Sequence, residues 1–207
     1  AVRAAADAVA ACEVLRRSIA ECCVRDHGND PAILASLLGI RRSCAMTNFE
    51  LRDSGFERIL VLAAPDTSEN RSGRIAQRLL ELETYRIMSL LSLPVAKQLA
   101  SKLATTEAQL VEITARLETN TVSDELLLSD LASLAAQVES TTAEHSYRFS
   151  AARAYDAIVK ERISEMRERP LSGIQTVGEF MQRRLAPAMA TVNATSERLA
   201  ALAQRVS

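Results

Sequence analysis

The feature that most constrains the fold of this chain is a helical pattern of apolar residues running from Glu69 to about Arg169. After Pro94, apolar or small side chains recur at alternating spacings of four and three residues, the pattern of a coiled-coil seam. Two further seams follow. The seam residues are Leu99, Leu103, Thr106, Leu110, Ile113 and Leu117, then Leu127, Leu131, Leu134 and Val138, then Met181, Leu185, Ala188, Val192, Thr195, Leu199, Leu202 and Val206. The pattern predicts long helices that pack along their length.

Two interruptions divide the pattern into arms. Pro94 predicts a kink or short break near residues 92–93, because proline lacks the N–H that a continuous helix needs. Residues 119–123 predict a turn before the next helix. At about 1.5 Å per residue, arms over 69–119 and 124–168 would be about 75 Å and 65 Å long. So short a turn predicts an antiparallel helical hairpin. A third long helix is predicted to begin near Val177.

A different pattern lies upstream of the long helices. Residues 43–51 and 56–63 are rich in apolar and β-favouring side chains, with a turn signal at 52–55 between them. They predict a β-hairpin, which needs further strands or a helix to cover it; a segment upstream of this chain is one possible source. The helical seams and this hairpin together predict a mainly α fold with a small α+β element at the base of the long hairpin.

The first residues are predicted to be helical. Residues 2–26 have a rough apolar face, and Pro31 is expected to open a short helix that runs to Leu38 and ends at Gly39. We therefore expect three parts: an N-terminal helical segment over 1–39, a β-hairpin and loop over 40–68, and a long-helix bundle over 69–207.

Composition and motifs argue against several classes of function. The 25 basic and 26 acidic residues leave a net charge of −1, so nothing predicts a nucleic-acid partner. No phosphate-binding glycine loop, nucleophile elbow or zinc-protease motif occurs, so we expect no enzyme, no catalytic residues and no cofactor. No apolar run reaches the ~18 residues of a membrane span.

Cysteine and histidine do not predict a metal site. The four cysteines, Cys12, Cys22, Cys23 and Cys44, contain no C-x-x-C pair and are interpreted as reduced small apolar residues. His27 lies in a turn near Cys23, which is too few ligands for zinc. His145 is interpreted as a polar seam residue that sets helix register.

A row of arginines at the start of the first long helix is the candidate binding feature. Arg71, Arg74 and Arg78 are spaced by three and four residues and therefore share one helix face. Positive charge at a helix start is unfavourable unless something negative meets it. Two alternatives remain open: acids of the facing arm, which we favour, or a bound anion such as a phosphate-bearing ligand or an anionic lipid headgroup. The acids considered are Glu144, Asp156 and Glu161.

Four segments carry a family resemblance. They are DSGFERILVLA, RSGRIAQRLLELETYRIMSLLSLPVAKQLA, SYRFSAARAYDAIV and IQTVGEFMQRRLAPAM. In order and spacing, over roughly residues 40–207, the chain is similar to a bacterial family of predicted membrane-anchored proteins of unknown function, the domain of unknown function 3422 family. The resemblance implies additional strands upstream and membrane-spanning helices downstream. It therefore implies a soluble fragment at the cytoplasmic face of the inner membrane, attached through segments outside this chain.

Two functions are expected from these observations. The first is a non-enzymatic cytosolic portion of a membrane-anchored protein that acts in assembly or scaffolding, as a homo-oligomer of two or more copies joined by the apolar seams. The alternative, by analogy of overall plan, is the soluble regulatory region of a CorA-like cation channel or transporter.

Overall fold

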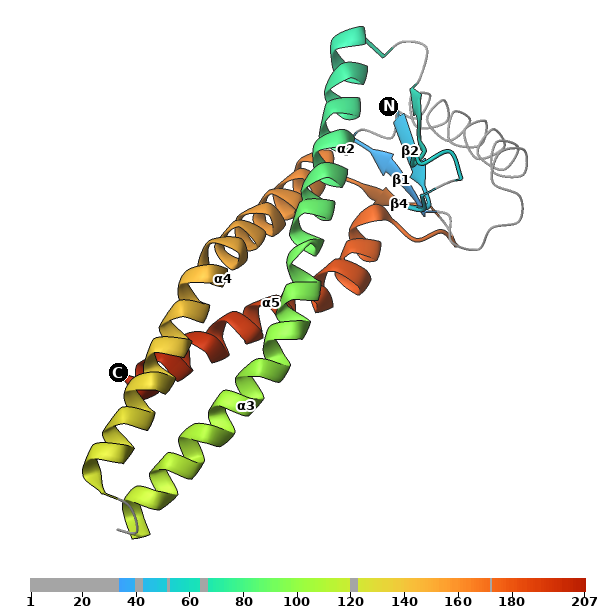
Figure 1. Ribbon diagram of the computed structural model, residues 1–207. Helices are drawn as coiled ribbons and strands as arrows, with labels where there is room; N and C mark the ends of the chain where they lie inside the picture. The colour runs from blue at the N-terminus through green and yellow to red at the C-terminus, as the bar shows by residue number, and fades with distance from the viewer. Residues whose placement is uncertain (1–33, 40–42, 52, 64–66, 120–122, 172) are drawn as a thin grey trace. The chain divides into compact units, whose positions relative to one another are not determined.

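The computed structural model describes residues 34–39, 43–51, 53–63, 67–119, 123–171 and 173–207 (Figure 1). Within these residues the protein is mainly α-helical, with one small antiparallel sheet, as predicted. The elements are β1 (Leu34–Leu38), β2 (Ser43–Thr47), β3 (Ile59–Ala63), α2 (Glu69–Leu90), α3 (Ser92–Thr119), α4 (Asp124–Met166), β4 (Arg169–Pro170) and α5 (Val177–Val206).

The chain divides into two compact units. The first comprises residues 1–83 and 159–184, and the second comprises residues 84–158 and 185–207. The sheet belongs to the first unit together with the beginning of α2, the end of α4 and the beginning of α5. The second unit contains the end of α2, all of α3 and the remaining parts of α4 and α5.

The sheet has the order β3-β2-β1-β4, and each neighbouring pair is antiparallel. The predicted β-hairpin is confirmed with shorter strands, because β2 pairs with β3 in a register that places Thr47 opposite Ile59 and Ser43 opposite Ala63. The further strands that the hairpin needs come from this chain itself, since β1 lies beside β2 and β4 lies beside β1.

The short helix predicted from Pro31 to Leu38 is wrong, because Leu34–Leu38 forms strand β1. All five residues of β1 are buried, and the strand has a neighbour on both sides. A five-residue segment with four apolar residues has no decisive periodicity of its own, so tertiary pairing determined its conformation. Gly39 ends the strand with a φ of +64°, a backbone conformation that glycine adopts without strain. The helix predicted over 2–26 lies outside the described residues.

The two central strands, β1 and β2, are buried on both faces. Ala35, Leu37, Cys44 and Met46 form an apolar cluster on one face. Neighbouring residues along the strands point to the opposite face, where the Ser36 hydroxyl bonds to Glu168 and to the backbone at the start of α5. The sheet thereby brings a buried polar side chain to the beginning of a long helix.

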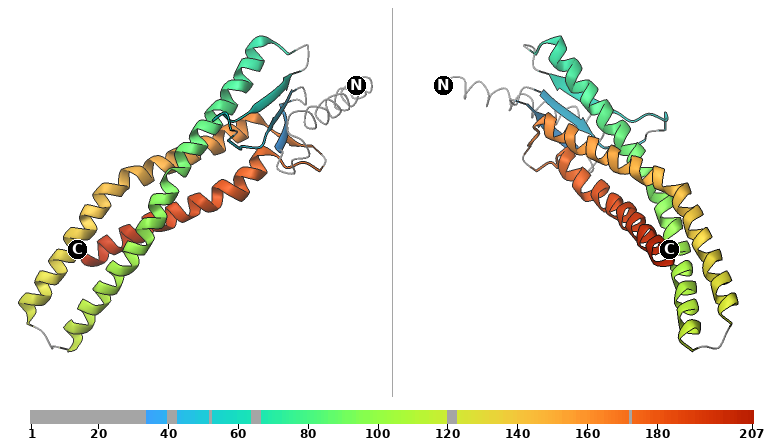
Figure 2. Two further views of the ribbon diagram at one scale, coloured as in Figure 1. Left: turned by 45° about the vertical axis from the view of Figure 1, so that its right-hand side comes forward. Right: turned by 90° about the vertical axis from the view of Figure 1, so that its left-hand side faces the viewer.

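The second unit contains the predicted antiparallel hairpin. Helices α3 and α4 run side by side in both views of Figure 2. Ser92 donates to the carbonyl of Arg148 at 3.5 Å, and Arg116 lies 3.5 Å from Asp130 nearer the turn. The break predicted at Pro94 is confirmed, since α2 ends at Leu90 and α3 begins at Ser92.

Most predicted seam residues form the core of the bundle. Those that are buried are Leu99, Leu103, Thr106, Leu110, Leu127, Leu134, Val138, Met181, Leu185, Val192, Thr195, Leu199, Leu202 and Val206. Leu117 is an exception, with 60% of its surface exposed near the end of α3. Pro187 lies inside α5, which continues through it to Val206. No helix in the described ranges is both long and apolar enough to cross a membrane.

Candidate functional site

The arginine row at the beginning of α2 lies in the first unit, and its three members have different surroundings. Arg78 forms an ion pair with Glu165 of α4, with 3.2 Å between Nε and Oε2. A guanidinium nitrogen of Arg71 lies so close to Gly39 that a Cβ on that glycine would be 2.9 Å away. Arg74 is exposed, and no ion pair joins it to another described residue. The acid found beside Arg78 is therefore Glu165, which was not among the acids considered from the sequence.

Arg78 belongs to a larger charge network between α2 and α4. Arg162 lies between two acids, 2.5 Å from Glu81 and 2.9 Å from Glu165. Gln77 also donates to Glu81, at 2.8 Å. The hydrogen bonds from Gln77 and Arg162 lower the pKa of Glu81, and the bond to Glu81 raises the pKa of Arg162. Two arginines and two glutamates are thus balanced, so Arg78 already has a negative partner.

The beginning of α5 is occupied by a carboxylate of the chain itself. Glu168 accepts the backbone N–H of Gly178 at 2.8 Å through Oε1 and the hydroxyl of Ser36 at 2.8 Å through Oε2. The Ser36 oxygen in turn accepts the N–H of Val177 at 3.0 Å. In other helices, the unpaired N–H groups of the first turn can bind an anion. The arrangement is a structural cap, and its N–H groups are already satisfied.

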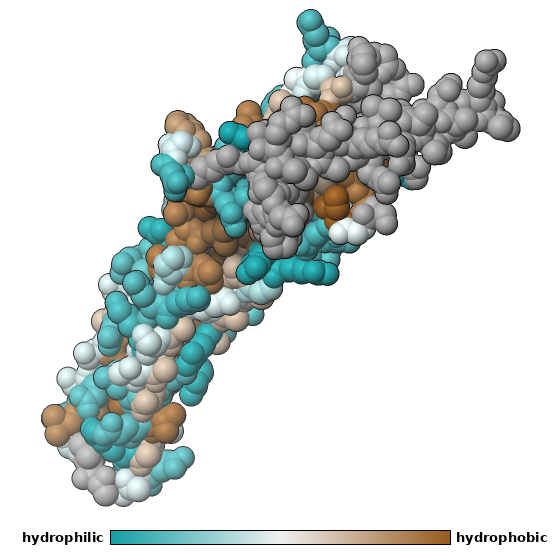
Figure 3. All heavy atoms as spheres, turned by 90° about the vertical axis from the view of Figure 1, so that its right-hand side faces the viewer, coloured by the Kyte–Doolittle hydropathy of each residue, from teal (hydrophilic) through white to brown (hydrophobic). Residues whose placement is uncertain are grey.

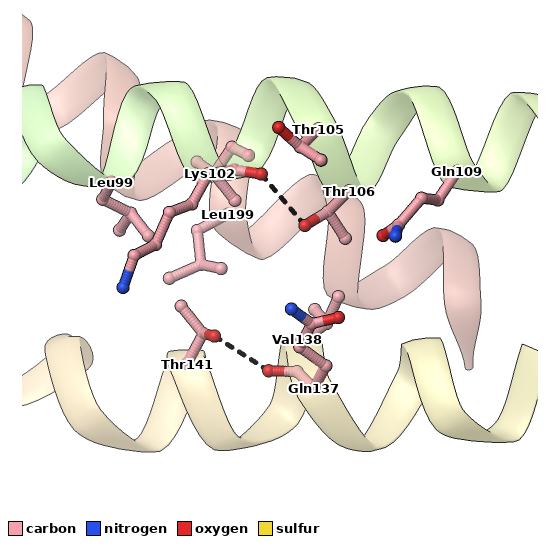
Figure 4. Close-up of a pocket in the computed structure, with 10 residues that line it drawn as sticks. Leu99, Lys102, Thr105, Thr106, Gln109, Gln137, Val138, Thr141 and Leu199 are labelled. Carbon is pink, nitrogen blue, oxygen red and sulfur yellow. Dashed lines mark hydrogen bonds between the residues drawn. The ribbon is translucent and has the colours of Figure 1, made fainter.

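A cavity of about 310 Å³ lies in the second unit between α3, α4 and α5. Figure 4 shows its residues on facing helices. Leu99 and Leu103 of α3, Val138 of α4 and Leu199 of α5 form a buried apolar floor. Lys102, Thr105, Thr106, Gln109, Gln137 and Thr141 supply the polar part of the lining. Lys102, Thr105, Gln109 and Gln137 are exposed, so the polar side of this hollow faces the solvent.

The polar side chains around this cavity point into the gap between the two arms. Lys102 and Gln109 extend from α3 toward α4, and Gln137 extends from α4 toward α3 (Figure 4). The hydroxyl protons of Thr106 and Thr141 are donated to carbonyls of their own helices, those of Lys102 and Gln137, at 3.0 and 2.8 Å. The sequence contained only a weak signal for this site. Its polar residues flank the seam positions of two helices, where solvent-exposed polar side chains are ordinary.

Histidine and cysteine assemble no metal centre in the part of the chain that is described. His145 lies 3.9 Å from Glu144 and has its ring centroid 6.1 Å from that of Phe149. Cys44 is a free, buried thiol in the sheet. Among the described residues no group of three or more histidine, cysteine or acidic side chains can hold a metal ion. His27 and the other three cysteines lie outside these ranges.

Apolar side chains are exposed along part of α2 and directly after its end. In the second unit, Ile87, Met88 and Leu91 expose 46%, 39% and 54% of their surface. Leu80, one heptad before Ile87 on the same helix, exposes 64%. Apolar side chains also reach the surface at the hairpin end (Figure 3), where Leu126 is 60% exposed. We call Ile87 and Met88 of α2, together with Leu91 directly after its last residue, the α2 apolar row.

The chain belongs to the family described as protein of unknown function, DUF3422, whose family model matches residues 5–207. The resemblance seen over residues 40–207 is thus confirmed and extends almost to the first residue. A search of curated proteins and a search of solved structures each gave no match. The description of the family states no function.

Proposed function

We propose that this chain is a non-enzymatic helical module that joins copies of a longer, membrane-attached protein. The observation that carries the proposal is the α2 apolar row. Most residues of the predicted seams are buried inside the bundle, so they leave little apolar surface for assembly. The α2 apolar row is instead exposed, with Ile87 and Leu91 one helical turn apart on the same side.

A second copy of the chain is the partner that best fits this row. Contiguous exposed apolar patches mark sites of association, whereas single exposed apolar residues are ordinary. Closed two-fold pairs are the commonest oligomers, and in them the same residues meet from both copies. Ile87 and Leu91 of two antiparallel helices would interdigitate around such an axis. The resemblance to predicted membrane-anchored proteins supports the further expectation that the full-length protein is held at the cytoplasmic face of the inner membrane.

Sedimentation equilibrium of this chain tests the assembly. We expect a concentration-dependent dimer, and we expect the double variant Ile87→Gln and Leu91→Gln to be monomeric with an unchanged helical circular-dichroism spectrum. The matched control is Leu126→Gln and Leu128→Gln, whose leucines are 60% and 69% exposed at the hairpin end. This control should still dimerise.

Two results would overturn the proposal: a wild-type chain that stays monomeric at high concentration, or a dimer that survives both glutamines in the α2 apolar row. A closed ring of more than two copies would instead favour the alternative, a regulatory region of a CorA-like cation channel. Membrane attachment is tested separately, by asking whether the full-length protein partitions with bacterial membranes.

A further inference from the structure

We propose that the outer edge of strand β3 is a docking site for an extended, uncharged β-strand of a partner protein. The inference is independent of the assembly proposed above, because none of its residues belongs to the α2 apolar row. Three observations carry it: the direction of the backbone groups of β3, the contrast with the opposite edge of the sheet, and the apolar, uncharged side chains of the strand.

Strand β3 lies at one end of the sheet, and the hydrogen bonds of β1 determine which backbone groups of β3 point outward. Ala35 donates its N–H to the carbonyl of Gln175 at 3.0 Å, away from β2. Directly after β1, Gly39 donates in the same way to the carbonyl of Met166 at 3.2 Å. Since successive residues of an antiparallel strand bond to opposite sides, the observed registers carry this alternation through β2 into β3.

The alternation leaves a row of backbone groups at the outer edge of β3. The N–H and C=O groups of Leu60 and Leu62 are the ones that bond to β2. Those of Ile59, Val61 and Ala63 point outward, and within the described ranges no backbone group pairs with them. All five residues of β3 are at least partly exposed, whereas β1 and β2 are buried throughout. Such a row of backbone donors and acceptors is a template for a further strand.

The opposite edge of the sheet resists such pairing. Strand β4 has two residues, and its Arg169 lies opposite Leu37 of β1, whose backbone groups point toward β4. Pro170 is therefore the residue of β4 that points outward, and proline has no N–H to donate. Short length, charge and proline are the devices that protect an edge strand from pairing. Strand β3 has five residues and contains neither a charge nor a proline.

The side chains of β3 specify the chemistry of the added strand. Leu60 and Leu62 pack against the apolar cluster on one face of the sheet, and Ile59 and Val61 lie on the opposite face. A strand beside β3 places its own side chains next to both rows. Apolar or β-branched side chains would extend both rows, whereas a charge would lie beside aliphatic side chains without a counter-charge. The edge therefore fits an extended, uncharged strand.

A synthetic peptide of alternating valine and threonine, with a lysine at each end for solubility, is the probe. Its binding to the full chain is followed by fluorescence anisotropy of a labelled peptide, and we expect saturable binding. Val61→Pro should abolish binding, because it removes an outward N–H, while an edge position whose N–H faces solvent tolerates proline. The matched control is Val61→Thr, which keeps the N–H and a β-branched side chain and should bind as the wild type does.

Two measurements on the wild-type chain test the same backbone bonds without relying on the folding of Val61→Pro. A peptide methylated on consecutive backbone nitrogens keeps its side chains but cannot donate, and it should not bind. Amide hydrogen exchange of Ile59 and Val61 should slow about tenfold when the unmethylated peptide is added. Without peptide, the exchange rates of these amides should not depend on protein concentration.

The proposal is overturned if the unmethylated peptide does not bind the wild type, or if the methylated peptide binds equally well. It is also overturned if a folded Val61→Pro variant binds as tightly as Val61→Thr, since the outward N–H would then have no role. Protection of Ile59 and Val61 that grows with protein concentration in the absence of peptide would overturn it as well, because a second copy of the chain would then occupy the edge.

Discussion

Glu168 and Gly178 meet at the first turn of α5, where the carboxylate of Glu168 accepts the backbone N–H of Gly178 at 2.8 Å. A Cβ on residue 178 would overlap with the same carboxylate oxygen and would lie 3.1 Å from Cγ2 of Ile163. The absence of a side chain at this position is thus what allows the acid to approach the helix start. The same acid accepts the hydroxyl of Ser36 in strand β1, so one carboxylate joins β1 to the beginning of α5.

Gly178→Ala should destabilise the protein by about 1–2 kcal/mol, because the new methyl group displaces a capping carboxylate. Gly73→Ala is the matched control, since nothing lies within 4 Å of a Cβ at that position on α2. It should stabilise the protein by about 0.4–1 kcal/mol, as alanine does in an open helix position. Denaturant unfolding measures both. Equal effects of the two substitutions would contradict the role assigned to Glu168.

Ser36→Ala should cost about 1–3 kcal/mol, because it leaves the buried N–H of Val177 without its acceptor and removes a donor to Glu168. Ser36 is fully buried, so water cannot replace these bonds. Amide hydrogen exchange of Val177 provides a local readout and should accelerate. A variant as stable and as protected as the wild type would show that the bond network at the start of α5 contributes nothing.

Arg78→Gln should lower the free energy of unfolding more than Arg74→Gln does. Arg78→Gln breaks the pair with Glu165, whose side chains are both 35% exposed, and should cost about 0.5–1 kcal/mol. Arg74→Gln should change stability by less than about 0.5 kcal/mol. If a bound anion meets the row instead, added phosphate will raise the melting temperature of the wild type, and Arg74→Gln will abolish that rise while leaving the fold intact.

Leu82→Ala and Leu80→Ala test which face of α2 is buried. Leu82 is completely buried, so its truncation should cost about 2–5 kcal/mol through lost burial and a residual cavity. Leu80 is 64% exposed, and its truncation should change the free energy of unfolding by less than about 0.5 kcal/mol. Thermal unfolding of the two variants is the measurement, and a reversed order would mean that the helix is rotated.

The free energy of unfolding should fall in acid, because protonation of Glu107 removes its ion pair with Arg198. The hydrogen bond from Arg198 lowers the pKa of Glu107 in the folded protein below its ordinary value of 4.5. The stabilisation is therefore fully present above that ordinary value and is lost as the pH falls through the lower folded pKa. In a double-mutant cycle with Glu107→Gln and Arg198→Gln, the coupling energy should shrink in acid and in high salt. A coupling energy that does not change with pH would refute the ion pair between Glu107 and Arg198.

The long helices could be predicted because their signal is repeated many times along the chain. Each seam has several apolar residues at helical spacing, so the positions of α3, α4 and α5 follow from the local pattern. Pro94 predicts a break because proline has no backbone N–H to donate. The β-hairpin was likewise predictable from two apolar segments and the turn between them. These features depend on residues that are near one another in the chain.

Strand β1 and the sites could not be predicted in this way. Residues 34–38 became a strand because β2 and β4 supply partners on both sides, and β4 comes from more than a hundred residues downstream. The partner of Arg78 is Glu165, whose position opposite α2 depends on how the two helices pack.

By itself the sequence determined the helices, their breaks and the hairpin, because backbone geometry and apolar periodicity act over a few residues. Only the tertiary structure decided which apolar face of α2 is buried, which acid meets Arg78, and that Glu168 caps the beginning of α5. Those outcomes depend on the packing of segments far apart in the chain, where burial and charge pairing are decided by the neighbour and not by the local pattern.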